Sequence, residues 1–154
     1  MRLYLVRHGD AVTHDIDPQR PLSDTGRLNA EKMAEYLKGI DVNMAEVWHS
    51  KKLRAKETAE IFADILGGEK MIRREKHGLS PDDPIGGIAS EISGEKKDLM
   101  IVGHLPFLDK LACALCEYSK DCGKIIFETA AVVALERADK GAWKLIFSKI
   151  PSMI

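Results

Sequence analysis

RLYLVRHG, at residues 2–9, is an apolar stretch that ends abruptly in arginine, histidine and glycine. Such a short run of large apolar residues predicts a strand that is buried on both faces, as central strands of a parallel sheet are. Gly9 marks the end of the strand. Because ligands in open α/β sheets bind beyond the carboxyl ends of the strands, Arg7 and His8 stand where a functional site is expected.

From this strand onward, the apolar spacing alternates between strand-like and helix-like stretches, without a linker or an internal repeat. The expected strands lie at 2–7, 45–49, 71–75, 99–102, 125–127, 131–136 and 143–147, with a turn at 139–141. The expected helices lie between Ser23 and Gly39, between Ser50 and Gly67, from 85 to 92 and from Leu105, with Ser23 and Ser50 as N-caps. This alternation predicts an α/β fold. We expect a three-layer α/β/α sandwich over residues 1–154, a single domain whose central sheet is mostly parallel, with some antiparallel pairing near the C-terminus.

The length and the charge of the chain exclude several classes of function. The chain has 154 residues, and 23 lysines and arginines against 24 aspartates and glutamates give a formal net charge of −1. This balance gives no bulk attraction to nucleic acid or to an anionic membrane, so we expect neither as a partner. The apolar start is interrupted at Arg7, too early for a signal peptide, and no apolar run approaches the roughly 18 residues of a spanning helix. We therefore expect a cytoplasmic protein.

Three cysteines, Cys113, Cys116 and Cys122, make an odd count in a chain without an export signal. Such a count predicts reduced thiols rather than a disulfide framework. Cys113 and Cys116 have a CxxC spacing, but they lie within an apolar helical pattern and no second pair of zinc ligands accompanies them. We therefore interpret both as core residues.

Polar and charged residues follow two further strands at their carboxyl ends. Ser50 follows the strand at 45–49, and Arg54 lies in the first turn of the next helix. His104 follows the strand at 99–102 and directly precedes another helix. With Arg7 and His8, these residues would converge on one edge of the sheet, where two helix N-termini also point. Arginine forks and free backbone N–H groups complement a phosphate, so this edge predicts a phosphate site.

A histidine among arginines also suggests catalysis. Like charges disfavour protonation of the imidazole, which leaves a ring nitrogen of His8 free to attack phosphorus. His104 can then donate a hydrogen bond to the developing charge on the phosphoryl group. An alternative is a metal-dependent phosphoesterase built on His8, Asp10 and His14. We favour a site without metal or cofactor, because the other strand ends supply arginines where a metal would need carboxylates or histidines.

Three blocks of the sequence, in this order, resemble the signature blocks of the histidine phosphatase (phosphoglycerate mutase-like) superfamily: RHGD at 7–10, HSKKLRAKETAE at 49–60 and VGHLPFL at 102–108. The short length and the RPLSDTG segment at 20–26 resemble its small SixA-type phosphohistidine phosphatases. This resemblance implies that His8 is the nucleophile and that Arg7, Arg54 and His104 form the phosphate pocket. Arg20 matches a further arginine that lines the pocket in the SixA-type branch.

One departure concerns the general acid. Mutases and general phosphomonoesterases of this superfamily place a glutamate after the third strand, whereas the equivalent loop here reads HGLSPDDP at 77–84. Glu75, Asp82 and Asp83 are nearby substitutes, and their spacing singles out none of them. An alkoxide leaving group needs a proton, but an imidazole departs from phosphohistidine far more readily. The missing glutamate therefore favours a phosphohistidine substrate.

Together these features predict a phosphatase that works through a phosphohistidine intermediate, with Arg7, His8, Arg54 and His104 as catalytic residues and Arg20 as a further phosphate ligand. The expected partner is a phosphohistidine-bearing protein or a small phosphorylated substrate, and we expect the chain to act as a monomer. Two alternatives stay open: a phosphatase or mutase for a small phosphomonoester, and a phosphoprotein-binding module without turnover.

Overall fold

The computed structural model describes residues 1–120, 122–138 and 141–154, and its central feature is a mixed sheet. The strands of this sheet are β1 (Arg2–Arg7), β2 (Glu46–His49), β3 (Ile72–Glu75), β4 (Leu99–Gly103), β5 (Val132–Glu136) and β6 (Lys144–Lys149). The α-helices are α1 (Asp24–Gly39), α2 (Leu53–Leu66), α3 (Gly86–Gly94) and α4 (Phe107–Leu115). Short 3₁₀ turns lie at η1 (Gly68–Lys70), η2 (Cys122–Lys124) and η3 (Pro151–Met153).

The sheet has the strand order β3-β2-β4-β1-β5-β6. Strands β3, β2, β4 and β1 run parallel to one another. Strand β5 is antiparallel to β1 and to β6. The predicted α/β architecture, mostly parallel with antiparallel pairing near the C-terminus, is therefore confirmed.

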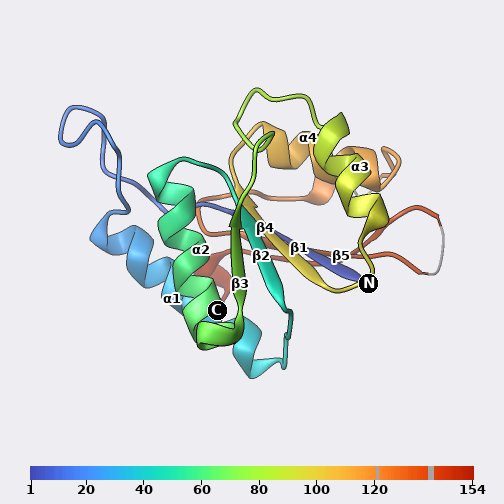
Figure 1. The fold of residues 1–154 in the computed structure, drawn as a ribbon, viewed down its shortest axis with the longest axis horizontal. Coiled ribbons are helices and arrows are strands. Elements are labelled where there is room, and N and C mark those ends of the chain that lie inside the picture. Colours follow the sequence, from blue (N-terminus) through green and yellow to red (C-terminus); the bar gives the residue numbers. More distant parts are fainter. Residues whose placement is uncertain (121, 139–140) are drawn as a thin grey trace.

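Helices cover both faces of this sheet, as Figure 1 shows. On β1 the alternation of side chains divides the core: Tyr4 and Val6 pack in the cluster that contains the apolar faces of α1 and α2. Leu3 and Leu5 pack in the second cluster, with residues of α3 and α4. All four side chains are buried, which explains why the strand is apolar without alternation. Strand β1 therefore lies between the two helical layers.

The two predicted helix caps have different outcomes. Ser23 caps α1 as expected, because its hydroxyl accepts a hydrogen bond of 3.0 Å from the Gly26 N–H. Ser50 does not cap α2: the helix begins at Leu53 with Lys52 as N-cap, and that cap makes no side-chain hydrogen bond. The hydroxyl of Ser50 is bound to His104 instead. The prediction for Ser50 was wrong because its partner lies on another strand end.

The segment at 125–127, predicted as a strand, contains no strand. Its apolar residues are explained by packing, since Phe127 is buried and Ile125 packs against the same core cluster. Of the turn predicted at 139–141, residues 139 and 140 lie outside the described residues. No helix in the described part of the chain is long and apolar enough to cross a membrane.

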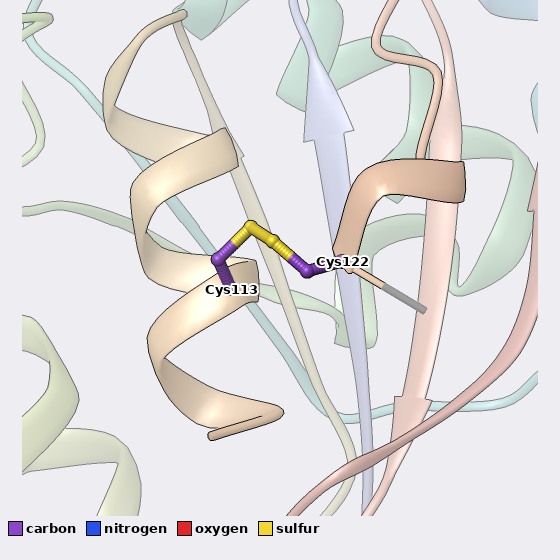
Figure 2. Close-up of a disulfide and its surroundings, with 2 residues drawn as sticks. All are labelled: Cys113 and Cys122. Atoms are coloured by element: carbon purple, nitrogen blue, oxygen red, sulfur yellow. A yellow bond between two sulfur atoms is a disulfide. The ribbon is translucent and has the colours of Figure 1, made fainter. Parts of the chain in front are cut away.

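The cysteine prediction was also wrong. Cys113, in α4, forms a disulfide with Cys122, at the start of η2, and their Cα atoms are 5.0 Å apart (Figure 2). That separation lies within the range of disulfide bonds. Cys116 is buried in the core cluster beside α4, as the apolar pattern predicts. The number of cysteines in the sequence does not indicate which sulfur atoms lie close enough to form a bond.

Candidate active site

The ends of three parallel strands meet at one edge of the sheet. The N–H of His8, just after β1, donates to the Gly103 carbonyl at 3.0 Å, and the Ser50 N–H, just after β2, donates to the Val102 carbonyl at 3.3 Å. Strand β4 therefore lies between the other two and ends level with them. The rings of His8 and His104 consequently lie close together, with their centroids 5.0 Å apart.

His8 is buried and held in one tautomer. Its side chain lies at the core boundary with 8% exposure, and Nδ1 is 2.7 Å from the Gly9 carbonyl oxygen. A carbonyl can only accept, so Nδ1 carries the proton and donates, which leaves the lone pair on Nε2. Burial, with the charges of Arg54 and Arg7, lowers the pKa of His8 to about 4. The ring is therefore neutral at pH 7, and Nε2 is available as a nucleophile.

His104 is still more buried, with 2% exposure, and its Nε2 lies 2.6 Å from the Ser50 hydroxyl. Burial, followed by the proximity of His8 and Arg54, lowers the pKa of His104 to about 3. This ring is also neutral at pH 7. It can bind an anion only through an N–H group, since it carries no charge of its own.

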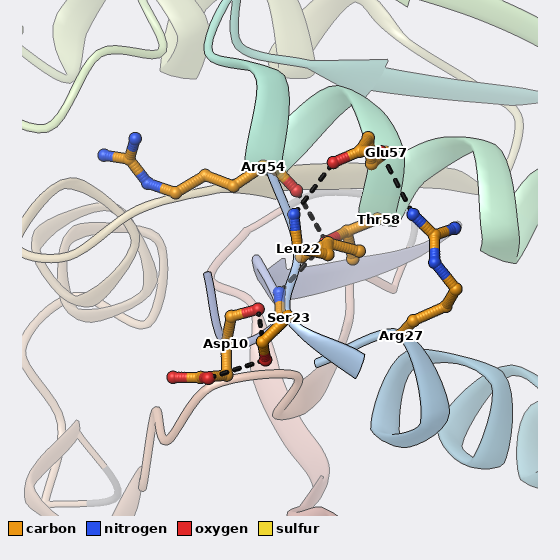
Figure 3. Close-up of polar contacts among 8 residues, drawn as sticks. Asp10, Leu22, Ser23, Arg27, Arg54, Glu57 and Thr58 are labelled. Atoms are coloured by element: carbon orange, nitrogen blue, oxygen red, sulfur yellow. Dashed lines mark hydrogen bonds and ion pairs between the residues drawn. The ribbon is translucent and has the colours of Figure 1, made fainter. Parts of the chain in front are cut away.

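Arginines from three segments surround the two rings. Arg7 donates from Nη1 to the Phe127 carbonyl at 2.8 Å. Arg20, with φ of 50°, donates from Nε to the Val12 carbonyl at 3.0 Å, and its charge acts on both His8 and Arg54. The side chain of Arg54 extends away from Glu57 of its own helix in Figure 3. The charges of Arg7, Arg20 and Arg54 therefore all act on His8.

Three buried nitrogen atoms at this edge have no hydrogen-bond partner among the described residues: Arg7 Nε, Arg54 Nε and His104 Nδ1. Leaving a buried donor unpaired costs about 1–3 kcal/mol, so such groups are rare and call for an explanation. The three atoms belong to residues at or just beyond the ends of different strands, and all of these residues lie at the same edge of the sheet. A tetrahedral oxyanion, with oxygens in several directions, would satisfy them together.

Sequence reasoning missed Thr58, which joins the nucleophile loop to α2. Its side chain is fully buried, and its hydroxyl accepts from the Gly9 N–H at 2.9 Å and donates to the Arg54 carbonyl at 2.7 Å. One hydroxyl thus fixes both the residue after His8 and the backbone of Arg54 (Figure 3). The available signal was the i, i+4 spacing from Arg54, which places both residues on one face of the helix.

Gly9 is required by close packing. A Cβ at Gly9 would lie 2.8 Å from the carbonyl oxygen of Gly26, and a Cβ at Gly26 would lie 2.0 Å from that of Asp10. The first turn of α1 therefore rests directly on the backbone after His8. Both positions need glycine because a side chain would push the two segments apart.

The loop from Ala11 to Pro21, which extends from the body of the molecule in Figure 1, is fastened at its ends. The Glu57 carboxylate accepts from the Leu22 N–H at 2.8 Å and pairs with Arg27 at 3.1 Å (Figure 3). Asp10 accepts from the Ser23 hydroxyl at 2.7 Å. Its carboxylate thus already has a structural partner. Within the described ranges, no group of three or more His, Cys, Asp or Glu side chains is arranged to hold a metal ion.

The candidate general acids lie on and after β3. Glu75, the last residue of that strand, and Asp82 are exposed. Asp83 is partly buried and accepts from the Ser80 N–H at 2.8 Å, so its carboxylate holds the turn of the loop. The charges that shift the pKa of His8 and His104 come from other cationic side chains, not from these carboxylates.

Comparisons by sequence found a matching family and similar proteins. Residues 3–76 match the Histidine phosphatase superfamily (branch 1). Over 146 residues, 92% of this chain and 88% of the relative, the chain is 27% identical to the phosphohistidine phosphatase SixA of Escherichia coli (strain K12). It is 32% identical over 124 residues, 75% of this chain and 73% of the relative, to an uncharacterized protein of Picosynechococcus sp. (strain ATCC 27264 / PCC 7002 / PR-6).

The fold is similar to that of a solved structure. The protein histidine phosphatase SixA complexed with tungstate superposes with a TM-score of 0.87, at 25% identity, and the match covers 99% of both chains. The likeness therefore extends over the whole sheet and both helical layers, beyond the residues that match the family. The chain belongs to the histidine phosphatase superfamily, branch 1, and is similar to SixA phosphatases over nearly its whole length.

Proposed function

We propose that this protein is a phosphatase that uses His8 as its nucleophile and acts on phosphohistidine in a protein. The observation that carries the proposal is the neutral His8 ring, with its lone pair on Nε2, at the same edge as three buried nitrogen atoms, two of them arginine N–H donors, without partners among the described residues. A nucleophile and an oxyanion receptor in one place are what phosphoryl transfer needs. SixA of Escherichia coli supports this choice of substrate. The SixA structure complexed with tungstate, an oxyanion that is tetrahedral like phosphate, supports an oxyanion as a ligand of this chain.

Two displacements make up the reaction. In the first, the Nε2 lone pair of His8 forms a bond to phosphorus while the bond from phosphorus to the substrate nitrogen breaks. The departing ring, which carries a proton on its other nitrogen, keeps that electron pair and leaves as neutral imidazole. In the second, water attacks phosphorus, His8 recovers its electron pair, and the proton of the water passes to solvent. Arg7, Arg20, Arg54 and His104 bind the phosphoryl oxygens through both steps.

The choice of phosphohistidine rests on the leaving group. A serine alkoxide must be protonated as it departs, whereas Glu75 and Asp82 are exposed and Asp83 accepts from the Ser80 N–H. An imidazole ring that is protonated on its other nitrogen departs as a neutral molecule and needs no acid from the protein. A small phosphomonoester is therefore the second candidate, favoured only if its leaving group is also good. Action as a monomer and a cytoplasmic location remain predictions from the sequence.

Phosphate release from a phosphohistidine-bearing protein, measured with a chelator present, tests the proposal. We expect the full chain to release inorganic phosphate and His8→Ala to lower the rate by about 10⁴-fold or more, as removal of other catalytic nucleophiles does. Phosphate retained by the substrate with the wild type, or undiminished release with His8→Ala, would overturn the proposal. Activity that the chelator abolishes would favour the metal-dependent alternative. Binding of the phosphoprotein without release would favour the non-catalytic module.

A further inference from the structure

The Ser50 hydroxyl is the partner of His104 and has no role in the mechanism above. Its side chain is 1% exposed and lies between two hydrogen-bonding groups. The Lys52 N–H donates to Ser50 Oγ at 3.3 Å, and Ser50 Oγ is 2.6 Å from His104 Nε2. Figure 1 shows that the strands involved, β2 and β4, are neighbours in the sheet. A chain of contacts therefore runs from the N-cap of α2 to the second histidine.

The direction of the bond between Ser50 and His104 follows from what each group can offer. A hydroxyl has one proton, and in this buried position the acceptor within reach is Nε2 of His104. Were Nε2 to carry the proton and donate, the hydroxyl proton would have no acceptor among the described contacts. The lone pair would then lie on Nδ1, which is buried without a partner in the described part of the chain. Two buried groups would be unsatisfied, and unsatisfied buried polar groups are rare in folded proteins.

In the opposite arrangement, only Nδ1 lacks a partner among the described contacts. With Ser50 donating to Nε2, the proton of the neutral ring lies on Nδ1. Nδ1 then presents an N–H to an oxyanion bound among the arginines, whereas a lone pair there would repel it. We propose that Ser50 is a positioning residue, which fixes the Nδ1–H tautomer of His104 so that this ring donates a hydrogen bond to the phosphoryl group.

Both histidine rings would then be protonated at Nδ1. His8 would act through its Nε2 lone pair, whereas His104 would act through its Nδ1–H. In His8 the backbone carbonyl of Gly9 holds the protonated Nδ1 and leaves the Nε2 lone pair to react. In His104 the Ser50 hydroxyl holds Nε2 and leaves the Nδ1–H to donate. A carbonyl accepts and a hydroxyl can donate, so the partner decides the role of the ring. The catalytic meaning of this inference rests on the proposed function, but the tautomer itself does not.

Nitrogen NMR measures the tautomer without turnover. The full chain, labelled with ¹⁵N at histidine, would be studied at pH 7, and the His104 signals assigned from their loss in His104→Asn. We expect a protonated Nδ1 and an unprotonated Nε2 in the wild type, and a mixture of tautomers in Ser50→Ala. A wild-type ring protonated at Nε2 would overturn the inference, whether or not the protein proves to be a phosphatase.

Kinetics separate positioning from a general structural role. Removal of one oriented donor typically costs 10²–10³ in rate. Because Ser50→Ala keeps the ring of His104, we expect a smaller fall in kcat/KM, about tenfold. The side chain of Ser50→Cys is similar in size but a weak donor, so the kcat/KM of this variant should lie between those of the wild type and Ser50→Ala. The cysteine variant also keeps the test valid if Ser50→Ala folds poorly. Ser93→Ala, which removes an exposed hydroxyl bound to the Ser90 carbonyl, is the matched control and should stay within about twofold of wild type.

The decisive variant combines Ser50→Ala with His104→Ala. If Ser50 acts through His104, the serine substitution should have no further effect on kcat/KM once the imidazole is absent. A full tenfold fall in that background would mean that Ser50 acts on the fold, and would overturn the positioning role. If the wild type itself releases no phosphate, the proposed function fails, while the NMR measurement still decides the tautomer.

Discussion

The edge formed by the ends of β1, β2 and β4 differs in chemistry from the adjacent end of β3 and its following loop. The first gathers two buried neutral histidines and a set of arginines, with three buried nitrogen atoms that have no hydrogen-bond partner among the described residues. The second carries carboxylates that are exposed or hold the turn of the loop, as Asp83 does. Under the proposed function, the first region would bind the phosphoryl group. The carboxylates of the second region would leave a departing alkoxide without an acid, and the difference between the regions would set the kind of leaving group that the site suits.

The largest expected effect comes from a substitution in the first region. Arg54→Ala removes a guanidinium whose buried Nε faces no protein partner in the described residues, and we expect kcat/KM for a phosphohistidine substrate to fall about 10³-fold. Arg27→Ala is the matched control, because its half-exposed guanidinium pairs with Glu57, and neither residue is among the proposed site residues. That variant should stay within about twofold, as surface ion pairs contribute little. Steady-state kinetics on both variants would contradict the account if the two losses were similar.

The leaving group tests the contrast between the regions directly. A small aryl phosphate, whose phenolate departs without a proton, should be hydrolysed at least about 10²-fold faster than phosphoserine, measured as kcat/KM for inorganic phosphate release. Comparable values for the two esters would mean that an acid does assist the departing oxygen. The second region would then have a catalytic role after all.

Acid should destabilise the first region through His8. Its pKa is lowered by burial and by the nearby arginines to about 4, below the unfolded value of 6.5, so the unfolded chain binds more protons between these values. The stability contributed by the neutral ring is complete above pH 6.5 and is lost as the pH falls toward 4. Between about pH 7.5 and 5, we expect the free energy of unfolding to fall by about 2 kcal/mol more in the wild type than in His8→Ala. Urea denaturation at both values measures this, and equal losses in the two proteins would contradict it.

The smallest effect is expected in the second region. Glu75→Gln and Asp82→Asn replace exposed carboxylates by amides of the same size. On a phosphohistidine substrate we expect each to change kcat by less than about threefold, because imidazole departs without an acid. A much larger fall for one of them, together with loss of the basic limb of the pH profile, would identify that residue as the missing acid.

The residues of the first region and the residues that support them differ in how far they could be predicted from the sequence. Arg7, His8, Arg54 and His104 lie at or just beyond the ends of predicted strands, so the rule on carboxyl ends of parallel strands is enough to predict that they converge. The supports of the site could not be found in this way. Thr58 binds a residue 49 positions away, and Arg7 is anchored by the carbonyl of Phe127, 120 positions away.

Local pattern failed where tertiary contacts decide the role of a residue. Ser50 has the chemistry of an N-cap and the position of one, yet its hydroxyl is bound to His104. The apolar segment at 125–127 packs against the core without forming a strand, and the pairing of Cys113 with Cys122 depends on how η2 returns to α4. In each case the role depends on contacts that the local pattern does not contain.

The central claim is a covalent bond from phosphorus to Nε2 of His8. Rapid mixing of excess enzyme with a phosphohistidine-bearing protein, quenched in alkali because phosphohistidine is labile to acid, should trap phosphate on the peptide that contains His8. Mass spectrometry would locate it, and His8→Ala would yield none. Complete release of phosphate in a single turnover, with no phosphorylated His8 at any time and with undiminished release by His8→Ala, would contradict the account.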